Sequence, residues 1–143
     1  MRTTVLLGFI EGTPAPQGSK RHVGKGRMIE TSKKLKPWRD TLTRELRQRW
    51  AGRPPLDIPV HVSAYFYLPR PQRPRFNNPA VPPDTDKLQR AVGDALQHAG
   101  ILKDDARIIR WTASKQYPDS DQATGVYLHL TYEQEIAPGE LSQ

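Results

Sequence analysis

The spacing of the apolar residues changes abruptly between residues 50 and 60. Before this point an apolar residue recurs every three or four positions, at Leu35, Trp38, Leu42, Leu46 and Trp50. This spacing predicts the buried stripe of an amphipathic helix over residues 34–50. From Val60 to Leu68 every second residue is apolar, which predicts a strand with one buried face. The sequence GRPPLDIP, rich in Pro, breaks the helix before the strand begins.

The other apolar runs add further strands and a second helix. Residues 3–11 precede a Gly- and Pro-rich turn signal, which predicts a buried strand. Residues 88–99 follow helical spacing up to Gly100, and residues 107–117 and 125–133 alternate like two strands joined by a polar loop. The sequence KRHVGKGRMIE is typical of a hairpin around residues 24–26. Pro37 places the first turn of the first helix near it.

These elements predict one domain of residues 1–135 and a flexible C-terminal tail of residues 136–143. The expected fold is α+β, a mixed sheet of about four or five strands with two helices packed on one face. The 14 prolines argue against an all-helical bundle. The order of the strands cannot be derived from these patterns.

Several classes of protein are excluded by composition. The chain has no cysteine, which excludes disulfides and thiolate metal sites, and its four histidines lack the spacing of a zinc site. The N-terminal apolar run is too short to cross a membrane and lacks a cleavage site. We therefore expect a soluble cytoplasmic protein with no membrane and no zinc partner. The three tryptophans lie on apolar stripes and are expected in the core.

The net charge of +7 is distributed unevenly. Residues 1–54 hold 13 Lys and Arg against 4 Asp and Glu, whereas the remainder is slightly acidic. A basic surface suits a polyanion such as DNA, with binding that falls steeply as salt is added, and a generic solvated surface is the alternative. The candidates for contacts with the DNA backbone are Lys20, Arg21, Lys25, Arg27, Lys33, Lys34, Lys36, Arg70, Arg73 and Arg75.

The sequence PPDTDKLQRAVGDALQHAGILKDD concentrates five aspartates in an otherwise basic chain. Asp84 is placed to cap the second helix, and Asp86, Arg90 and Asp94 are each four residues apart on its polar face. Asp104 and Asp105, at the end of this segment, follow a short turn that can return the chain beside the helix. Taken singly, each carboxylate has an ordinary explanation. Asp84 or Asp86 could be a helix cap, Asp86 and Asp94 could pair with Arg90 at the surface, and Asp104 and Asp105 could belong to a loop. Together the carboxylates would repel one another unless a cation lay between them, as Mg²⁺ with oxygen ligands does.

This segment resembles the signature of the RusA-type Holliday junction resolvases, approximately Asp-x-Asp-Asn-Leu, a basic residue, Asp-Ala-Leu, then Gly and Asp-Asp. GTPAPQGSKR and KPWRD resemble the N-terminal half of phage and prophage members. The resemblance runs from about residue 10 to residue 132. By position it assigns metal binding and catalysis to Asp84, Asp86 and Asp105, and a catalytic contact with phosphate to Arg90, where the best-known members carry an essential lysine. It assigns supporting positions to Asp94, Asp104 and Lys87, the last where asparagine is common.

The resemblance implies a homodimeric endodeoxyribonuclease that uses Mg²⁺, with Mn²⁺ as an alternative, in a bacterial host cell or encoded by a phage or prophage. Its substrate would be branched DNA, a four-way junction cut by paired symmetric nicks in recombination or repair. Two alternatives remain open: a nuclease acting on flaps or forks in phage replication or packaging, and a DNA-binding homologue without activity. A calcium-binding module is excluded because the aspartates lack the alternating loop with a central glycine.

Overall fold

The computed structural model of the protein describes residues 1–18 and 25–133, with the backbone alone at residues 25–32. The predicted tail of residues 136–143 lies outside the described residues. The elements are β1 (Arg2–Glu11), α1 (Lys25–Trp50), β2 (Val60–Tyr67), α2 (Thr85–His98), the short 3-10 helix η1 (Asp105–Arg107), β3 (Ile108–Gln116) and β4 (Gly125–Glu133). This order confirms the predicted α+β class.

The four strands form one mixed sheet in the order β1-β4-β2-β3. β4 lies between β1 and β2 and is antiparallel to both, whereas β2 and β3 are parallel. α2 lies in the crossover between these parallel strands. β3 and β4 follow one another in the chain but do not pair, because β2 lies between them.

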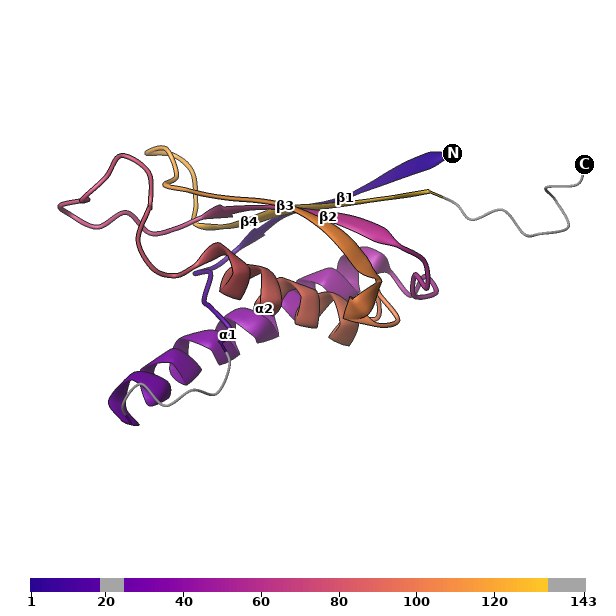
Figure 1. Cartoon of the computed structure of the whole chain (residues 1–143), viewed down its shortest axis with the longest axis horizontal. Helices are drawn as coiled ribbons and strands as arrows, with labels where there is room; N and C mark the ends of the chain where they lie inside the picture. Colours follow the sequence, from indigo (N-terminus) through magenta and orange to yellow (C-terminus); the bar gives the residue numbers. More distant parts are fainter. Residues whose placement is uncertain (19–24, 134–143) are drawn as a thin grey trace, which may run out of the picture.

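Both helices cover the same face of the sheet, as predicted, and α1 also extends beyond the sheet at its N-terminal end (Figure 1). α1 begins at Lys25, so the prediction of a hairpin is wrong from Lys25 onward, and Pro37 lies inside the helix rather than in its first turn. The apolar stripe begins at Leu35 in the sequence, and the preceding turns of α1 extend beyond the sheet (Figure 1). Pro37 removes one backbone hydrogen bond from the ladder, which the packing of the following turns offsets.

The apolar stripes predicted for the two helices meet the sheet in one core. Trp38, Leu42, Leu46 and Trp50 of α1 are at most 3% exposed. They pack in one cluster with the buried residues of α2 and with alternate residues of β2 and β4. Trp111 of β3 is partly buried against the same cluster, so the prediction that the tryptophans serve the core is confirmed. Across the described chain, no helix is both long and apolar enough to cross a membrane.

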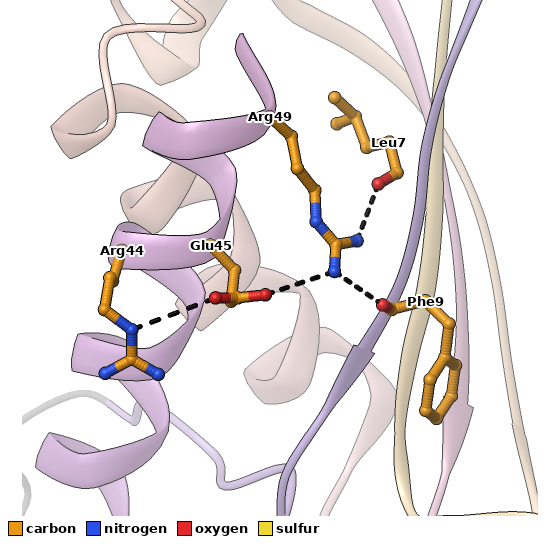
Figure 2. A network of polar contacts seen from close by, with 5 residues as sticks. All are labelled: Leu7, Phe9, Arg44, Glu45 and Arg49. Atoms are coloured by element: carbon orange, nitrogen blue, oxygen red, sulfur yellow. Dashed lines mark hydrogen bonds and ion pairs between the residues drawn. The ribbon is translucent and has the colours of Figure 1, made fainter. Parts of the chain in front are cut away.

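A charged network ties α1 to the edge strand β1. The register of β1 against β4 shifts between Leu6 and Gly8, and Gly8 has a φ of 85°, which favours glycine. Arg49 donates to the carbonyl oxygens of Leu7 and Phe9 at 2.7 and 2.8 Å (Figure 2). The same guanidinium lies 3.3 Å from a carboxylate oxygen of Glu45. Arg49 therefore satisfies the carbonyls that the irregular strand turns toward the helix.

Candidate functional site

Two of the predicted metal ligands lie at the N-terminus of α2. Asp84 is the N-cap residue, with φ −72° and ψ 146°, and its carbonyl oxygen accepts a hydrogen bond from the Leu88 N–H at 3.1 Å. Its carboxylate makes no capping hydrogen bond, contrary to expectation, and instead lies 3.7 Å from Nζ of Lys87. Asp86 is exposed in the first turn, where the positive end of the helix dipole favours its charge. Both carboxylates are therefore available to a ligand.

The loop that leads into α2 is held by Lys115, which lies near the end of β3. Its Nζ donates to the carbonyl oxygens of Val81 and Pro83 at 2.9 and 3.0 Å. These two bonds fix the backbone immediately before Asp84. The sequence did not indicate this role, because the partners are backbone oxygens more than 30 residues away and leave no side-chain pattern.

Asp105 lies against the middle of α2. Its Cβ is 4.0 Å from the position that a Cβ on Gly93 would occupy. Its backbone N–H donates to Oε1 of Gln97 at 2.9 Å, which joins η1 to the helix. The carboxylate of Asp104, the N-cap residue of η1, accepts a hydrogen bond from the Ala106 N–H at 2.9 Å. The predicted return of the chain beside the helix is thus confirmed.

The carboxyl group of Asp105 occupies an environment that disfavours its negative charge. Partial burial raises its pKa above the ordinary value of 3.8, and the charge of Asp104, a side-chain hydrogen bond with Asp104, and the charge of Asp94 raise it further. A bound cation would reverse this effect. Carboxyl groups with raised pKa values are more frequent at functional sites than elsewhere.

The structure brings Asp105 to α2 but does not assemble the three predicted ligands into one set. Asp86 precedes Gly93 by two turns on the same helix face, which is about 10 Å along the axis at 1.5 Å per residue. Within residues 1–18 and 25–133, no three or more His, Asp or Glu side chains are grouped closely enough to hold a metal ion. The donor chemistry suits Mg²⁺, which binds carboxylate oxygens. The expected common site is not preformed.

We refer to Asp84, Asp86, Asp104 and Asp105 as the α2 carboxylates. Apart from the 3.7 Å contact between Asp84 and Lys87, none of them forms an ion pair with Lys or Arg in the described part of the chain. Three of the four carboxylates, those of Asp86, Asp104 and Asp105, are therefore unpaired among the described residues.

Asp94 differs from the α2 carboxylates because α1 neutralises it. Nη2 of Arg39 lies 2.6 Å from its carboxylate, and Nε2 of Gln17 donates to the same oxygen at 3.3 Å. Asp94 therefore joins α1, α2 and the segment that follows β1. Arg90, its expected neighbour on the polar face, is exposed, and its side chain has no hydrogen bond or ion pair with another described residue.

The N-terminal group of predicted DNA contacts is described only in part. Lys20 and Arg21 lie outside the described residues, and Lys25 and Arg27 lie on the first turn of α1. Lys33 and Lys34 are exposed and come from the same helix. Lys36 is also exposed but pairs with Asp40 at 2.9 Å.

The arginines of the loop after β2 are also at the surface. Arg70 lies over the ring of Tyr117, with its guanidinium carbon 5.6 Å from the ring centre. Arg75 lies over Phe76 at 5.1 Å, and Arg73 is exposed. Stacking of this kind orders the guanidinium groups without neutralising them.

A basic groove on α1 was not predicted. It has a volume of about 520 Å³, and its basic lining residues are Lys36, Arg39, Arg44, Arg47 and His98. Arg47 donates to the backbone oxygen of His98 at 3.1 Å, so the groove lies where α1 meets the end of α2. The basic residues of α1 recur at helical spacing, and that spacing was the available signal.

A comparison with protein families matches residues 11–129 to the family described as Endodeoxyribonuclease RusA. The matched region runs from the end of β1 into β4 and includes Asp84, Asp86 and Asp105. No curated protein matches the chain. The family match covers most of the chain and agrees with the resemblance of the acidic segment.

Proposed function

The chain belongs to the RusA family of endodeoxyribonucleases, and we propose that it resolves four-way DNA junctions by paired symmetric nicks, using Mg²⁺. The observation that supports this proposal is the unpaired charge among the α2 carboxylates, where burial and neighbouring acids raise the pKa of Asp105. A carboxylate outside this region, Asp57, is instead paired with Arg107 at 2.7 Å. Carboxylates that lie beside α2 without a basic partner are suited to a cation that also binds a phosphate.

In this proposal Asp84, Asp86 and Asp105 would hold the metal ion, and they would have to move together to do so, because the described acidic side chains form no ready ligand group. When bound, Mg²⁺ or Mn²⁺ would polarise a phosphoryl oxygen and lower the pKa of a water molecule. The protein orients Asp84 through the loop bonds of Lys115 and orients Asp86 through the first turn of α2. Arg90, one turn beyond Asp86, stabilises negative charge on the phosphate, as a guanidinium can do by paired hydrogen bonds.

The exposed basic residues of α1 and of the loop after β2 hold the DNA backbone in this proposal. Such contacts orient a duplex without reading its bases, so recognition would depend on the shape of the branch. We further propose that the protein is a homodimer, because two symmetric cuts require two equivalent sites related by a two-fold axis. Analytical ultracentrifugation of the full chain tests the dimer.

One assay tests the activity. The purified protein is incubated with a synthetic four-way junction, a flap and a linear duplex of matched sequence, each with Mg²⁺ or with EDTA. Paired nicks in the junction that require Mg²⁺ support the proposal. Preferential cleavage of the flap would show instead that the substrate is another kind of branched DNA.

A second candidate function is binding of branched DNA without cleavage. The observation that favours it is the absence of a preformed ligand set among the described acidic side chains. Arg90 also stands where the best-known members of the family carry lysine. Tight junction binding with no nicks in Mg²⁺ or Mn²⁺ would establish this candidate instead.

A further inference from the structure

An apolar pocket lies beside the start of α2, close to Asp84. It has a volume of about 580 Å³ and is lined by thirteen residues from the segment after β1, from α1 and from the loops after β2 and β3. Seven of the thirteen are prolines, which have fixed φ angles and so lose little freedom when a ligand binds. Two further lining residues, Ala15 and Leu68, belong to the buried core. The pocket is therefore rigid and part of the fold.

The charged groups identified at the pocket lining and on its aromatic ring are basic. Among the described residues, Lys34 is the only charged residue that lines it, and no acidic side chain does. Tyr117 also lines it, and the guanidinium of Arg70 lies 5.6 Å from the centre of the Tyr117 ring. An aromatic ring and aliphatic walls with cations beside them are suited to a flat base attached to a phosphate.

The pocket is also continuous with the predicted active site. Pro83 lines the pocket and immediately precedes Asp84. The backbone of this connection is held by Lys115, which bonds to the carbonyl oxygens of Val81 and Pro83. A ligand in the pocket would therefore lie beside the start of α2, next to Asp84.

We propose that this pocket binds one unpaired nucleotide at the branch point of the DNA substrate. The base stacks on Tyr117 among the prolines, and Lys34 and Arg70 contact its phosphate. The volume is within the range of small-molecule sites. This inference rests on the proposed function, because the proposed branched substrate is the DNA that would supply the unpaired base. An apolar side chain from a second copy of the chain would also fit the prolines, but it would leave the two cations without a role.

The test uses the fluorescence of 2-aminopurine, a base analogue that is quenched by stacking. The full-length protein is titrated, in EDTA so that nothing is cleaved, into branched DNA with one unpaired 2-aminopurine at the branch. A matched DNA carries the analogue in a fully paired arm. The variants are Tyr117→Ala, which removes the ring, Tyr117→Phe, which keeps it, and Thr13→Trp, which fills the pocket from an exposed lining position. Thermal melting checks that each variant is folded.

We expect the wild type and Tyr117→Phe to quench the unpaired analogue, and Tyr117→Ala and Thr13→Trp to bind that DNA about tenfold more weakly, a typical loss for one stacked base. Equal binding and quenching by all four proteins would overturn the proposal. A change of oligomeric state in Thr13→Trp with unchanged quenching would also overturn it, in favour of a second copy as the occupant. Nicking in Mg²⁺ is measured separately: quenching without nicking rejects the nuclease and keeps the pocket, whereas nicking without quenching rejects the pocket alone.

Discussion

The Arg49 network and the α2 carboxylates both place charged groups beside a helix, but they differ in how the charge is neutralised. Arg49 contacts two backbone oxygens and Glu45, all within 3.3 Å. Asp86, Asp104 and Asp105 lack a Lys or Arg partner among the described residues, and the pKa of Asp105 is raised by burial and by Asp104 and Asp94. The first arrangement stabilises a strand. In the second, the charge of Asp105 costs stability, and we infer that it is retained because it binds a cation and a phosphate.

The largest effect is expected when the α2 carboxylates are changed. Asp86→Asn and Asp105→Asn keep the shape of the side chain and remove its charge, so junction nicking should fall at least about 100-fold, equivalent to about 2.7 kcal/mol in the barrier. Nicking is measured at saturating Mg²⁺ with the four-way junction. The matched control is Asp121→Asn, in the loop after β3, which should keep normal activity. Full activity in both test variants would remove these aspartates from the mechanism.

The Arg49 network should show the opposite behaviour. Arg49→Met leaves the carbonyl oxygens of Leu7 and Phe9 without donors and should lower the free energy of unfolding by about 2–3 kcal/mol. Urea unfolding measures the change. The control Arg44→Met removes an exposed side chain 3.8 Å from Glu45 and should cost less than about 0.5 kcal/mol. Nicking per folded molecule should be preserved in Arg49→Met, and its loss there would end the contrast between the two regions.

The two types of carboxylate should also respond oppositely to pH. The pKa of Asp57 is lowered from 3.8 by its hydrogen bond with Arg107, so Asp57 stabilises the fold above pH 3.8, and this contribution is lost as the pH falls through the lowered pKa. The pKa of Asp105 is raised above 3.8, so its ionisation destabilises the fold once the pH exceeds the raised value, and the penalty disappears as the pH falls toward 3.8.

Urea unfolding in EDTA between pH 3 and pH 7 measures this difference. At neutral pH Asp57→Asn should be less stable than the wild type, and Asp105→Asn slightly more stable. Both differences should shrink in acid. A loss of stability in Asp105→Asn at neutral pH would show that its charge serves folding.

The smallest effect is expected at Gly93, beneath Asp105. A Cβ at this position would lie 3.6 Å from Cδ1 of Ile108 and from Cζ2 of Trp111, which is ordinary van der Waals contact. Gly93→Ala should therefore raise the free energy of unfolding by about 0.5–1 kcal/mol through helix propensity. Thermal melting detects this change. A marked loss of stability would mean that Asp105 packs more tightly on α2 than the structure shows.

The elements that could be predicted from the sequence are those with a periodic apolar face. The stripes of α1 and α2 and the alternation of β2 predict which residues are buried, because burial leaves a period in the chain. The turns of α1 before Leu35 project past the sheet and carry no such period, so the glycines at residues 24 and 26 suggested a hairpin instead. The position of β4 between β1 and β2 depends on contacts between distant segments and leaves no local signal.

The candidate site was predictable to a similar extent. The resemblance to the RusA signature assigned the site to Asp84, Asp86 and Asp105, which stays a prediction, whereas the predicted return of the chain beside the helix is confirmed. The sequence did not show that Asp105 lies two turns along α2 from Asp86, because the length of the turn does not determine where η1 rests on the helix. Lys115 and Arg49 could not be found at all, since both bind backbone oxygens of remote segments.

The most direct test of the central claim is metal binding measured without any DNA. The free energy of unfolding of the wild type, Asp105→Asn and Asp57→Asn is measured by urea with and without Mg²⁺. A ligand that binds only the folded state stabilises it by about 2.7 kcal/mol at 100 times its dissociation constant. We predict that rising Mg²⁺ stabilises the wild type and Asp57→Asn and leaves Asp105→Asn nearly unchanged. The same response to Mg²⁺ in all three proteins, or no response in the wild type, would contradict the assignment of the α2 carboxylates to a cation.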